Sequence, residues 1–194
     1  EAPVQVIDVQ RESTVLGGAG NVVNNLLSLG AKVSVLSVVG DDDNGKELLC
    51  MLETLGADAK GIVKQENRKT SKKSRVIASH QQVVRYDSES KDDITKASVD
   101  ALLSQCASYI PNVDVVLLSD YGKGVLTTTF TSHVIEFAKK YQKPILVDPK
   151  GEDYSKYKGV TLITPNKKEA SLATKIAIKD DESFMCYKGK LRID

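Results

Sequence analysis

Apolar and polar positions along the chain follow the periods of helices and strands in turn. In residues 22–29 the apolar side chains recur at the spacing of one helix face, and Val33 to Val39 follows as a run without glycine, proline or charge. Residues 43–55 repeat the helical spacing after a cluster of aspartates, which suit the positive end of a helix. We therefore expect a helix, a buried strand and a second helix in this region.

The same alternation becomes regular after Asp92. The expected elements are helices over Thr95–Tyr109 and Thr127–Tyr141 and strands over Val113–Leu118, Ile145–Val147 and Val160–Ile163. Buried strands separated by amphipathic helices are typical of a parallel sheet that helices cover on both faces. The sequence therefore predicts an α/β fold, with ligands bound beyond the carboxyl ends of the strands.

Shorter segments interrupt this pattern and predict a second, smaller sheet. Its expected strands are Pro3–Gln10, Ile62–Lys64, Ser74–Ser79 and Gln82–Tyr86, the last two forming a hairpin that turns near His80–Gln81. Both faces of these strands carry apolar residues, so the small sheet needs a partner to cover it. We expect one domain, with the small sheet built from about residues 3–10 and 62–87 and the α/β core from about 16–56 and 92–194.

The composition narrows the classes of function. The chain has 27 basic and 26 acidic residues, and this balance argues against a nucleic-acid-binding protein. No apolar run is long enough to cross a membrane, and no signal peptide opens the chain. Cys50, Cys106 and Cys186 lack the spacing of metal ligands and are interpreted as reduced thiols, which indicates a cytoplasmic protein.

A glycine-rich loop precedes the first expected helix. The segment Gly17–Gly20 leaves a backbone that a ligand can approach closely, and Asn21 can hold a hydroxyl or cap the helix. A simple packing loop is the alternative, because glycine-rich turns are common. The loop also begins like a dinucleotide-binding fingerprint, but Val23 stands where the third glycine is needed.

The segment Gly40–Glu47 resembles a phosphate-binding P-loop and lies between an expected strand and an expected helix. Glu47 replaces the Ser or Thr with which a P-loop holds magnesium. Asp41, Asp42 and Asp43 would also repel the phosphates. We therefore do not count this segment among the candidate phosphate sites.

Expected strands of the core end in polar, charged or glycine residues. These ends are Ser119–Gly124, Asp148–Gly151 and Thr164–Glu169. Since the carboxyl ends of parallel strands lie at one edge of a sheet, the three ends together favour a binding site over solvated turns. Lys123 and Lys150 could neutralise phosphate charge there, or could be ordinary surface lysines.

Asn166 and Glu169 stand three residues apart at an expected helix start, so both point to the same side. An amide and a carboxylate in this position could hold Mg²⁺ through water and orient phosphates. The alternative is a capping box, with Asn166 as N-cap and Glu169 at the third helical position. The residues alone favour the cap and leave both interpretations open.

These motifs resemble those of the ribokinase-like carbohydrate kinases. The resemblance rests on Gly17–Asn21 with Gly30 and Gly40 at fixed spacing, and on Asn166-x-x-Glu169 after a strand. It implies a three-layer α/β/α fold with a mostly parallel central sheet, and a small β-sheet that forms a lid over the sugar. It also implies phosphoryl transfer from ATP with Mg²⁺, and a homodimer that pairs through the lid sheets.

The heptose-phosphate branch of this family has similar motifs at the three strand ends, Ser119–Gly124, Asp148–Gly151 and Thr164–Glu169, and at Arg85 of an expected lid strand. The implied reaction converts D-glycero-D-manno-heptose 7-phosphate to the 1,7-bisphosphate for ADP-heptose and lipopolysaccharide synthesis, in the kinase part of a bifunctional enzyme. The implied substrate-binding residues are Gly17, Gly18, Asn21, Arg85, Asp120 and Lys123. The residues implied for the ATP phosphates are Lys150, Asn166, Lys167, Lys168 and Glu169, of which Asn166 and Glu169 also serve the metal through water.

Parts of the family pattern are missing from the sequence. The family's general base is an aspartate in a Gly-Ala-Gly-Asp motif, and no such motif occurs here. The buried strand that usually opens such a domain is also missing, and near Phe184 a helical pattern passes abruptly into a strand-like one. We therefore expect the catalytic base in a segment missing from an incomplete chain. A non-catalytic sugar-phosphate or nucleotide-binding domain of the same fold is the alternative.

Overall fold

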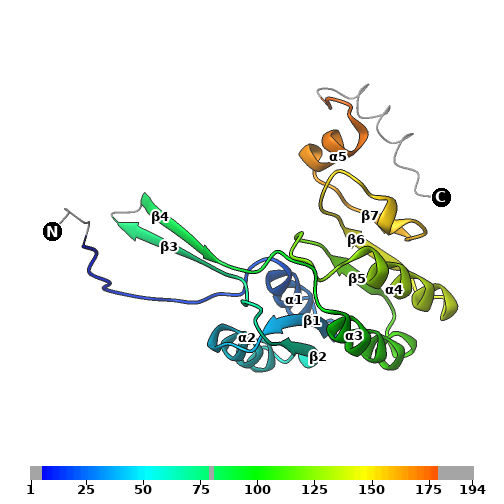
Figure 1. The fold of residues 1–194 in the computed structure, drawn as a ribbon, viewed down its shortest axis with the longest axis horizontal. Helices are drawn as coiled ribbons and strands as arrows, with labels where there is room; N and C mark the ends of the chain where they lie inside the picture. The colour runs from blue at the N-terminus through cyan, green and yellow to red at the C-terminus, as the bar shows by residue number, and fades with distance from the viewer. Residues whose placement is uncertain (1–5, 79–80, 179–194) are drawn as a thin grey trace.

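The computed structural model describes residues 6–78 and 81–178, and a hairpin projects from its main body (Figure 1). Its helices are α1 (Ala19–Ser28), α2 (Asp43–Thr54), α3 (Lys96–Tyr109), α4 (Thr128–Lys140) and α5 (Lys167–Thr174), with short 3₁₀ turns η1 (Ile110–Asn112) and η2 (Ser155–Tyr157). Its strands are β1 (Ser34–Gly40), β2 (Asp58–Gln65), β3 (Lys72–Ala78), β4 (Gln81–Ser88), β5 (Val116–Ser119), β6 (Ile145–Asp148) and β7 (Leu162–Ile163). None of these helices combines the length and the apolarity that crossing a membrane requires. The expected change of pattern near Phe184 and the thiol of Cys186 lie outside the described residues.

Helices α2 to α5 each begin at a residue whose side chain caps the helix. Asp42 accepts from the Gly45 N–H, Thr95 from the Ser98 N–H, Thr127 from the Phe130 N–H, and Asn166 from the Glu169 N–H. Each cap satisfies a backbone donor that has no partner inside its helix. Because the caps come from short polar side chains, the sequence located the starts of α3 and α4 to within one residue.

The strands of the core pair in parallel. The sequence predicted one sheet, whereas in the described chain β6 lies between β5 and β7, and β1 pairs separately with β2. The register places Ser119 of β5 beside Asp148 of β6. Beyond β7, the Thr164 N–H donates to the Val147 carbonyl at 2.9 Å. The carboxyl ends of β5, β6 and β7 therefore lie at one edge.

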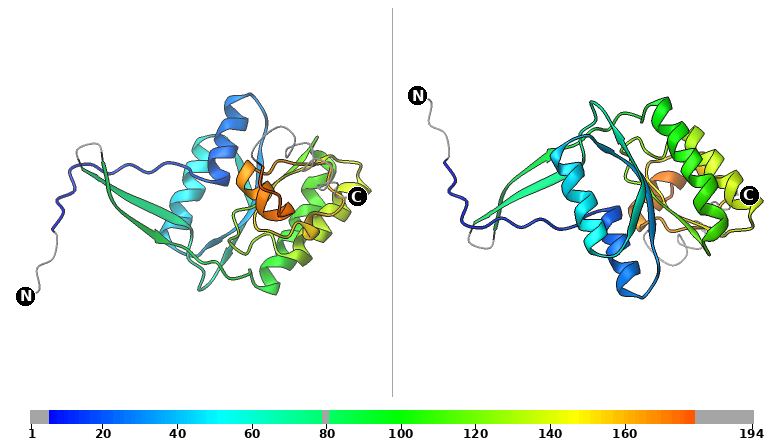
Figure 2. Two further views of the ribbon diagram at one scale, coloured as in Figure 1. Left: turned by 90° about the horizontal axis from the view of Figure 1, so that it is seen from above. Right: turned by 90° about the horizontal axis from the view of Figure 1, so that it is seen from below.

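Helices cover the strands on two sides. Figure 2 shows α1 and α2 on one side of the strands and α3 and α4 on the other. The main core joins the two groups of strands, because Val38 of β1 is buried in one cluster with Leu118 of β5 and Leu102 of α3. A second cluster joins α1 to α2 through Val23 and Leu52. The predicted α/β fold, with parallel strands between two layers of helices, is confirmed.

The small sheet differs from the prediction. Strands β3 and β4 form the expected antiparallel hairpin, which extends from the body beside the N-terminal segment (Figure 1). The segment Ile62–Lys64 does not join this hairpin, because it belongs to β2 and pairs in parallel with β1. Residues 6–10 form no strand. Residues 3–5 of the predicted first strand and His80 of the predicted turn lie outside the described residues.

Ile62–Lys64 and residues 6–10 both differ from the prediction because a segment forms a strand only where another strand pairs with its backbone. Alternation of apolar residues predicts which face of a segment can be buried, but it does not say which strand will pair with it. β2 buries Ala59 and Gly61 in the core, where β1 satisfies its backbone. Val6 and Val9 are 89% and 68% exposed, so their alternation finds no face to pack against in the described chain.

The loop after β5 depends on a glycine, and Gly124→Ala should destabilise the protein more than Gly30→Ala. Both glycines have left-handed backbones, with φ of +73° and +85°. A Cβ at Gly124 would overlap the carbonyl oxygen of Asp92, whereas a Cβ at Gly30 meets nothing within 4 Å. We expect a loss of about 1–2 kcal/mol for Gly30→Ala from backbone strain alone, and about 3–4 kcal/mol for Gly124→Ala because the backbone must also move.

Urea unfolding of the two variants measures this difference. Equal losses of unfolding free energy would contradict the close approach of Gly124 to Asp92.

Candidate functional site

The loops beyond β5, β6 and β7 meet at one edge of the sheet. The Asp120 N–H, just after β5, donates to the Asp148 carbonyl at the end of β6 at 2.9 Å. The Lys150 Nζ, beyond β6, lies 2.9 Å from Glu169 Oε1 in the first turn of α5. The structure thus brings together Asp120, Lys150 and Glu169, which the sequence placed at three separate strand ends.

Asp120 is buried and shapes the loop that follows it. The residue is only 5% exposed. Its Oδ1 accepts a hydrogen bond from the Gly122 N–H at 2.7 Å, and its Oδ2 accepts from the Tyr157 hydroxyl and from Lys156 Nζ, each at 2.6 Å. A buried carboxylate needs such donors, and here they come from the protein itself. In this structure Asp120 therefore holds its loop in shape, and Lys123 is the charged residue that the loop carries.

The glycine-rich loop lies beside the loop after β5. Gly18 is the N-cap of α1, and a Cβ built on it would lie 3.5 Å from the ring of Tyr121. Gly17 and Gly18 are exposed, and Asn21 is exposed in the first turn of α1. The three predicted sugar-binding residues of this loop are therefore exposed, and Gly18 among them adjoins Tyr121.

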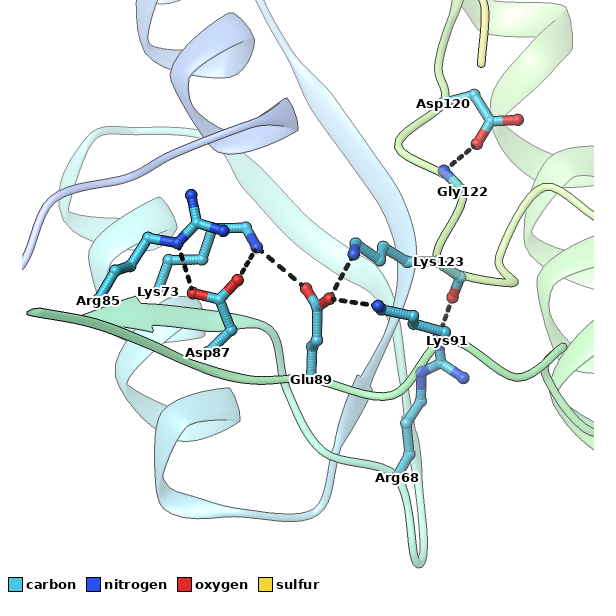
Figure 3. A network of polar contacts seen from close by, with 9 residues as sticks. All are labelled: Arg68, Lys73, Arg85, Asp87, Glu89, Lys91, Asp120, Gly122 and Lys123. Atoms are coloured by element: carbon cyan, nitrogen blue, oxygen red, sulfur yellow. Dashed lines mark hydrogen bonds and ion pairs between the residues drawn. The ribbon is translucent and has the colours of Figure 1, made fainter. Parts of the chain in front are cut away.

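A carboxylate links the hairpin to the loop after β5 (Figure 3). Glu89 directly follows β4, and its side chain is 9% exposed. Its Oε1 lies 2.5 Å from Lys123 Nζ, and its Oε2 lies 3.3 Å from Lys73 Nζ of β3. The hydrogen bond from Lys123, against the effect of burial and with help from Lys73, holds the pKa of Glu89 below its ordinary value. The position of Lys123 is thus tied to the hairpin.

Arg85 belongs to the same network through the hairpin. Its Nε lies 3.2 Å from Asp87 Oδ1, and Asp87 Oδ2 lies 2.8 Å from Lys73 Nζ. Lys91 Nζ lies 3.7 Å from Glu89 Oε1. Lys73, Arg85, Lys91 and Lys123 thus share the two carboxylates of Asp87 and Glu89 (Figure 3). The network therefore keeps a net positive charge, which suits an anionic ligand.

Asn166 and Glu169 form a capping box, which was one of the two interpretations that the sequence left open. Asn166 Oδ1 accepts from the Glu169 N–H at 3.0 Å, and Glu169 Oε2 accepts from the Asn166 N–H at 3.1 Å. Burial by itself raises the pKa of Glu169, but the hydrogen bonds from Lys150 and from the Asn166 backbone hold it below its ordinary value. Lys167 and Lys168 are exposed in the same turn and form no ion pair in the described part of the chain.

Asp148 adds a second carboxylate near Glu169. It is half-buried at the end of β6, and its pKa is raised by burial and then by the charge of Glu169. A divalent cation near these groups would relieve that repulsion. Within residues 6–78 and 81–178, no group of three or more His, Cys, Asp or Glu side chains is arranged to hold a metal ion. Mg²⁺ is usually bound by one or two carboxylates together with water and phosphate oxygens, so Asp148 and Glu169 alone would supply only part of its ligands.

The segment Gly40–Glu47 has a structural role. Asp42 accepts from the Gly45 N–H and from the Thr70 N–H, each at 2.8 Å. The Gly40 N–H donates to Thr70 Oγ1 at 2.9 Å. A P-loop keeps its backbone N–H groups free for phosphate, whereas here a carboxylate occupies the turn. The structure agrees with leaving this segment out of the phosphate sites.

Sequence reasoning missed Glu89, Lys156 and Tyr157. Each forms a hydrogen bond with a residue far along the chain: Glu89 with Lys123, and Lys156 and Tyr157 with Asp120. No local motif marks them, since contacts of this range depend on the packing of the whole fold. The available signal was Asp120 itself, because a carboxylate that directly follows a buried strand needs donors from elsewhere in the protein.

The sequence matches the pfkB family of carbohydrate kinases over residues 2–192. Curated relatives include the "Bifunctional protein HldE" of Sulfurimonas denitrificans, 58% identical over 184 residues, and that of Geobacter sulfurreducens, 52% identical over 190 residues. These matches cover 95% and 98% of this chain, respectively, and 39% of each relative. The chain thus spans 39% of the length of these relatives.

Solved structures share the fold at low sequence identity. Arabidopsis thaliana ribokinase complexed with ribose and ATP has a TM-score of 0.71 at 16% identity, and the match covers 96% of this chain and 60% of that one. The tetrameric inhibited form of phosphofructokinase-2 from Escherichia coli has a TM-score of 0.70 at 18% identity, covering 95% and 63%. The predicted ribokinase-like fold is confirmed.

Glu89→Gln should lower stability near neutral pH but not in acid. A carboxylate with a lowered pKa stabilises the folded protein above its ordinary pKa, and this stabilisation disappears as the pH falls through the lowered value. Glutamine keeps the shape of glutamate but carries no charge. We therefore expect the variant to unfold at lower urea than the wild type at about pH 7, with the difference shrinking towards about pH 3.

The control is Glu136→Gln on α4, an exposed glutamate without an ion pair in the described chain. A difference between Glu89→Gln and wild type that stayed constant with pH would show that the charge of Glu89 does not hold the hairpin.

Proposed function

Because this chain belongs to the pfkB family of carbohydrate kinases, we propose that it is part of an enzyme that transfers the terminal phosphate of ATP to a sugar phosphate. The proposed acceptor is D-glycero-D-manno-heptose 7-phosphate, converted to the 1,7-bisphosphate for ADP-heptose and lipopolysaccharide inner-core synthesis. The motifs at the strand ends support this acceptor, and the word "bifunctional" in the relatives' names supports a kinase combined with a second activity. ATP as the donor favours the cytoplasm as the location.

One observation carries the proposal: two different loops meet at one sheet edge. The loop after β5 bears Lys123 and adjoins the glycine loop, while Lys150 and Glu169 pair beyond β6 and β7. A backbone hydrogen bond of 2.9 Å from Asp120 to Asp148 holds the two sides together. This meeting of two loops supports the proposal, because phosphoryl transfer needs the acceptor hydroxyl and the donor phosphate side by side and in line.

On the acceptor side, the glycine loop offers backbone and amide groups to the sugar hydroxyls. Lys123 and Arg85 offer positive charge to the phosphate that the substrate already carries. Asp120 contributes by holding the loop that carries Lys123. The proposed acceptor-side residues are Gly17, Gly18, Asn21, Arg85, Asp120 and Lys123.

On the donor side, one lysine pairs with a fixed carboxylate, and two exposed lysines lie in the same helical turn. The capping box holds Glu169 in place, and Lys150 balances its charge. Mg²⁺, when bound near Asp148 and Glu169, supplies charge neutralisation for the ATP phosphates. The proposed donor-side residues are Lys150, Asn166, Lys167, Lys168 and Glu169, with Asn166 and Glu169 serving the metal through water.

The proposal assigns no catalytic base to these residues. The Gly-Ala-Gly-Asp motif expected for the base does not occur in the 194 residues. The roles proposed for them are positioning and charge neutralisation, which are the main sources of rate in phosphoryl transfer.

Glu169→Gln in the full-length protein should impair catalysis while the fold is kept. Glutamine also suits the third helical position of a capping box, so α5 should persist. We expect sugar-phosphate-dependent ADP release to fall by about tenfold or more, and the Mg²⁺ requirement to rise, because a charge near the metal is lost. A coupled assay of ADP release across a Mg²⁺ titration measures both.

Glu136→Gln again serves as the control. If the turnover of Glu169→Gln equalled that of the wild type at every Mg²⁺ concentration, Glu169 would only cap α5. Absence of ADP release by the wild type with heptose 7-phosphate would contradict the proposed function and favour a binding domain.

We further propose that two copies pair through the hairpin. Ile77, Val83 and Tyr86 are 65%, 53% and 61% exposed, although all are large apolar or aromatic residues. A two-stranded hairpin is only marginally stable by itself, and an exposed apolar surface of this kind is typical of an interaction site. The tetrameric form of the structural neighbour phosphofructokinase-2 supports assembly within this fold.

Ile77→Lys should convert the dimer to monomer. The buried charge would be costly in a paired hairpin but harmless on an exposed one. Sedimentation of the full-length protein at about micromolar concentration should show a dimer for the wild type and for Leu29→Lys, whose side chain is 83% exposed at the end of α1. A wild-type monomer under these conditions would count against pairing through the hairpin.

A further inference from the structure

Tyr157 is a buried residue outside the loops assigned above. It ends η2, in the connection between β6 and β7, and it is 0% exposed. Its ring packs in the main core beside Tyr154, with the ring centroids 6.0 Å apart. A phenylalanine would pack in the same way, so the presence of a hydroxyl at this position needs a separate explanation.

The hydroxyl of Tyr157 contacts both sides of the site. It donates to Asp120 Oδ2 at 2.6 Å and accepts from the Lys150 N–H at 3.3 Å. Asp120 shapes the loop that carries Lys123, and Lys150 reaches Glu169 with its side chain. One oxygen atom therefore bridges the acceptor-side loop and the donor-side loop.

Charge neutralisation does not explain this hydroxyl. Lys156 Nζ also lies 2.6 Å from Asp120 Oδ2 and supplies the opposite charge. The hydroxyl instead fixes the position of Asp120 relative to the backbone of Lys150, because it forms hydrogen bonds with both at the same time. Burial, and then the hydrogen bond to Asp120, raise the pKa of Tyr157, so the group stays protonated and keeps donating.

We propose that Tyr157 is a positioning residue that sets the spacing between the sugar-phosphate side and the nucleotide side of the site. The inference rests on the proposed kinase function, because that function assigns the two loops to two substrates. A small error in the alignment of two bound reactants slows their reaction more than it weakens the binding of either. The hydroxyl should therefore affect kcat more than either KM.

Tyr157→Phe in the full-length protein tests this directly, since it removes only the hydroxyl. We expect kcat for heptose 7-phosphate phosphorylation to fall about 10- to 100-fold, while KM for ATP and KM for the sugar phosphate each change by less than about threefold.

The matched control is Tyr109→Phe. The Tyr109 hydroxyl also donates to an aspartate, Asp58 Oδ2, at 3.0 Å, but at the start of β2, away from the carboxyl ends of the strands. Its kcat should stay within about twofold of wild type. Equal kcat values in the two variants would overturn the proposal. So would loss of folded protein in Tyr157→Phe, because Tyr157 would then be only a core residue.

A double variant tests the route of the effect. If Tyr157 acts by holding Asp120, then Tyr157→Phe combined with Asp120→Asn should have a kcat no lower than that of the more impaired single variant. If the double variant instead lost kcat by the product of the two single losses, Tyr157 would not act through Asp120.

Hydrogen exchange separates this inference from the proposed function. If wild type releases no ADP with the sugar phosphate, the proposed function fails, and exchange decides the role of Tyr157. The inference requires faster exchange of the Gly122 and Lys150 amides in Tyr157→Phe, and not in Tyr109→Phe. Unchanged exchange at both amides would overturn it.

Discussion

The site depends on the hydrogen bonds that the buried carboxylate of Asp120 accepts. Removing a carboxylate from water is costly unless donors surround it, and the donors here come from Gly122, Lys156 and Tyr157. These hydrogen bonds hold the loop after β5 against the turn η2. These internal hydrogen bonds give the carboxyl edge of the sheet a defined shape, and the proposed reaction needs such a shape to hold two substrates in line.

The hairpin is attached to this edge mainly by charge and hydrogen bonds. Its apolar side chains are largely exposed, whereas Glu89 binds Lys123 and Arg68 donates to the carbonyls of Asp92 and Lys123. In the proposed enzyme Lys123 thus belongs to both the hairpin network and the acceptor side. Attachment through polar groups is weaker and more easily rearranged than a packed core, which suits a segment that covers a substrate.

Much of the fold could be predicted from the sequence, because local physics determines it. The cap at Thr95 and the helical spacing of Leu102 located α3, and the ends of parallel strands located Asp120 and Glu169 at one edge. The prediction was wrong for Ile62–Lys64 because a strand's partner depends on the whole topology. Glu89 and Tyr157 were missed for a related reason: their partners lie 34 and 37 residues away.

In the proposed enzyme, the charges at the donor side favour ATP together with a metal over ATP alone. Asp120 and Glu169 each have a lysine within 2.9 Å or less, Lys156 and Lys150 respectively. Asp148 forms no ion pair in the described chain, and burial together with the charge of Glu169 raises its pKa. The polyphosphate of ATP would meet repulsion from such a carboxylate if nothing lay between them. A divalent cation near Asp148 would turn that repulsion into attraction for both groups, so the same residue that opposes bare ATP favours ATP bound with Mg²⁺.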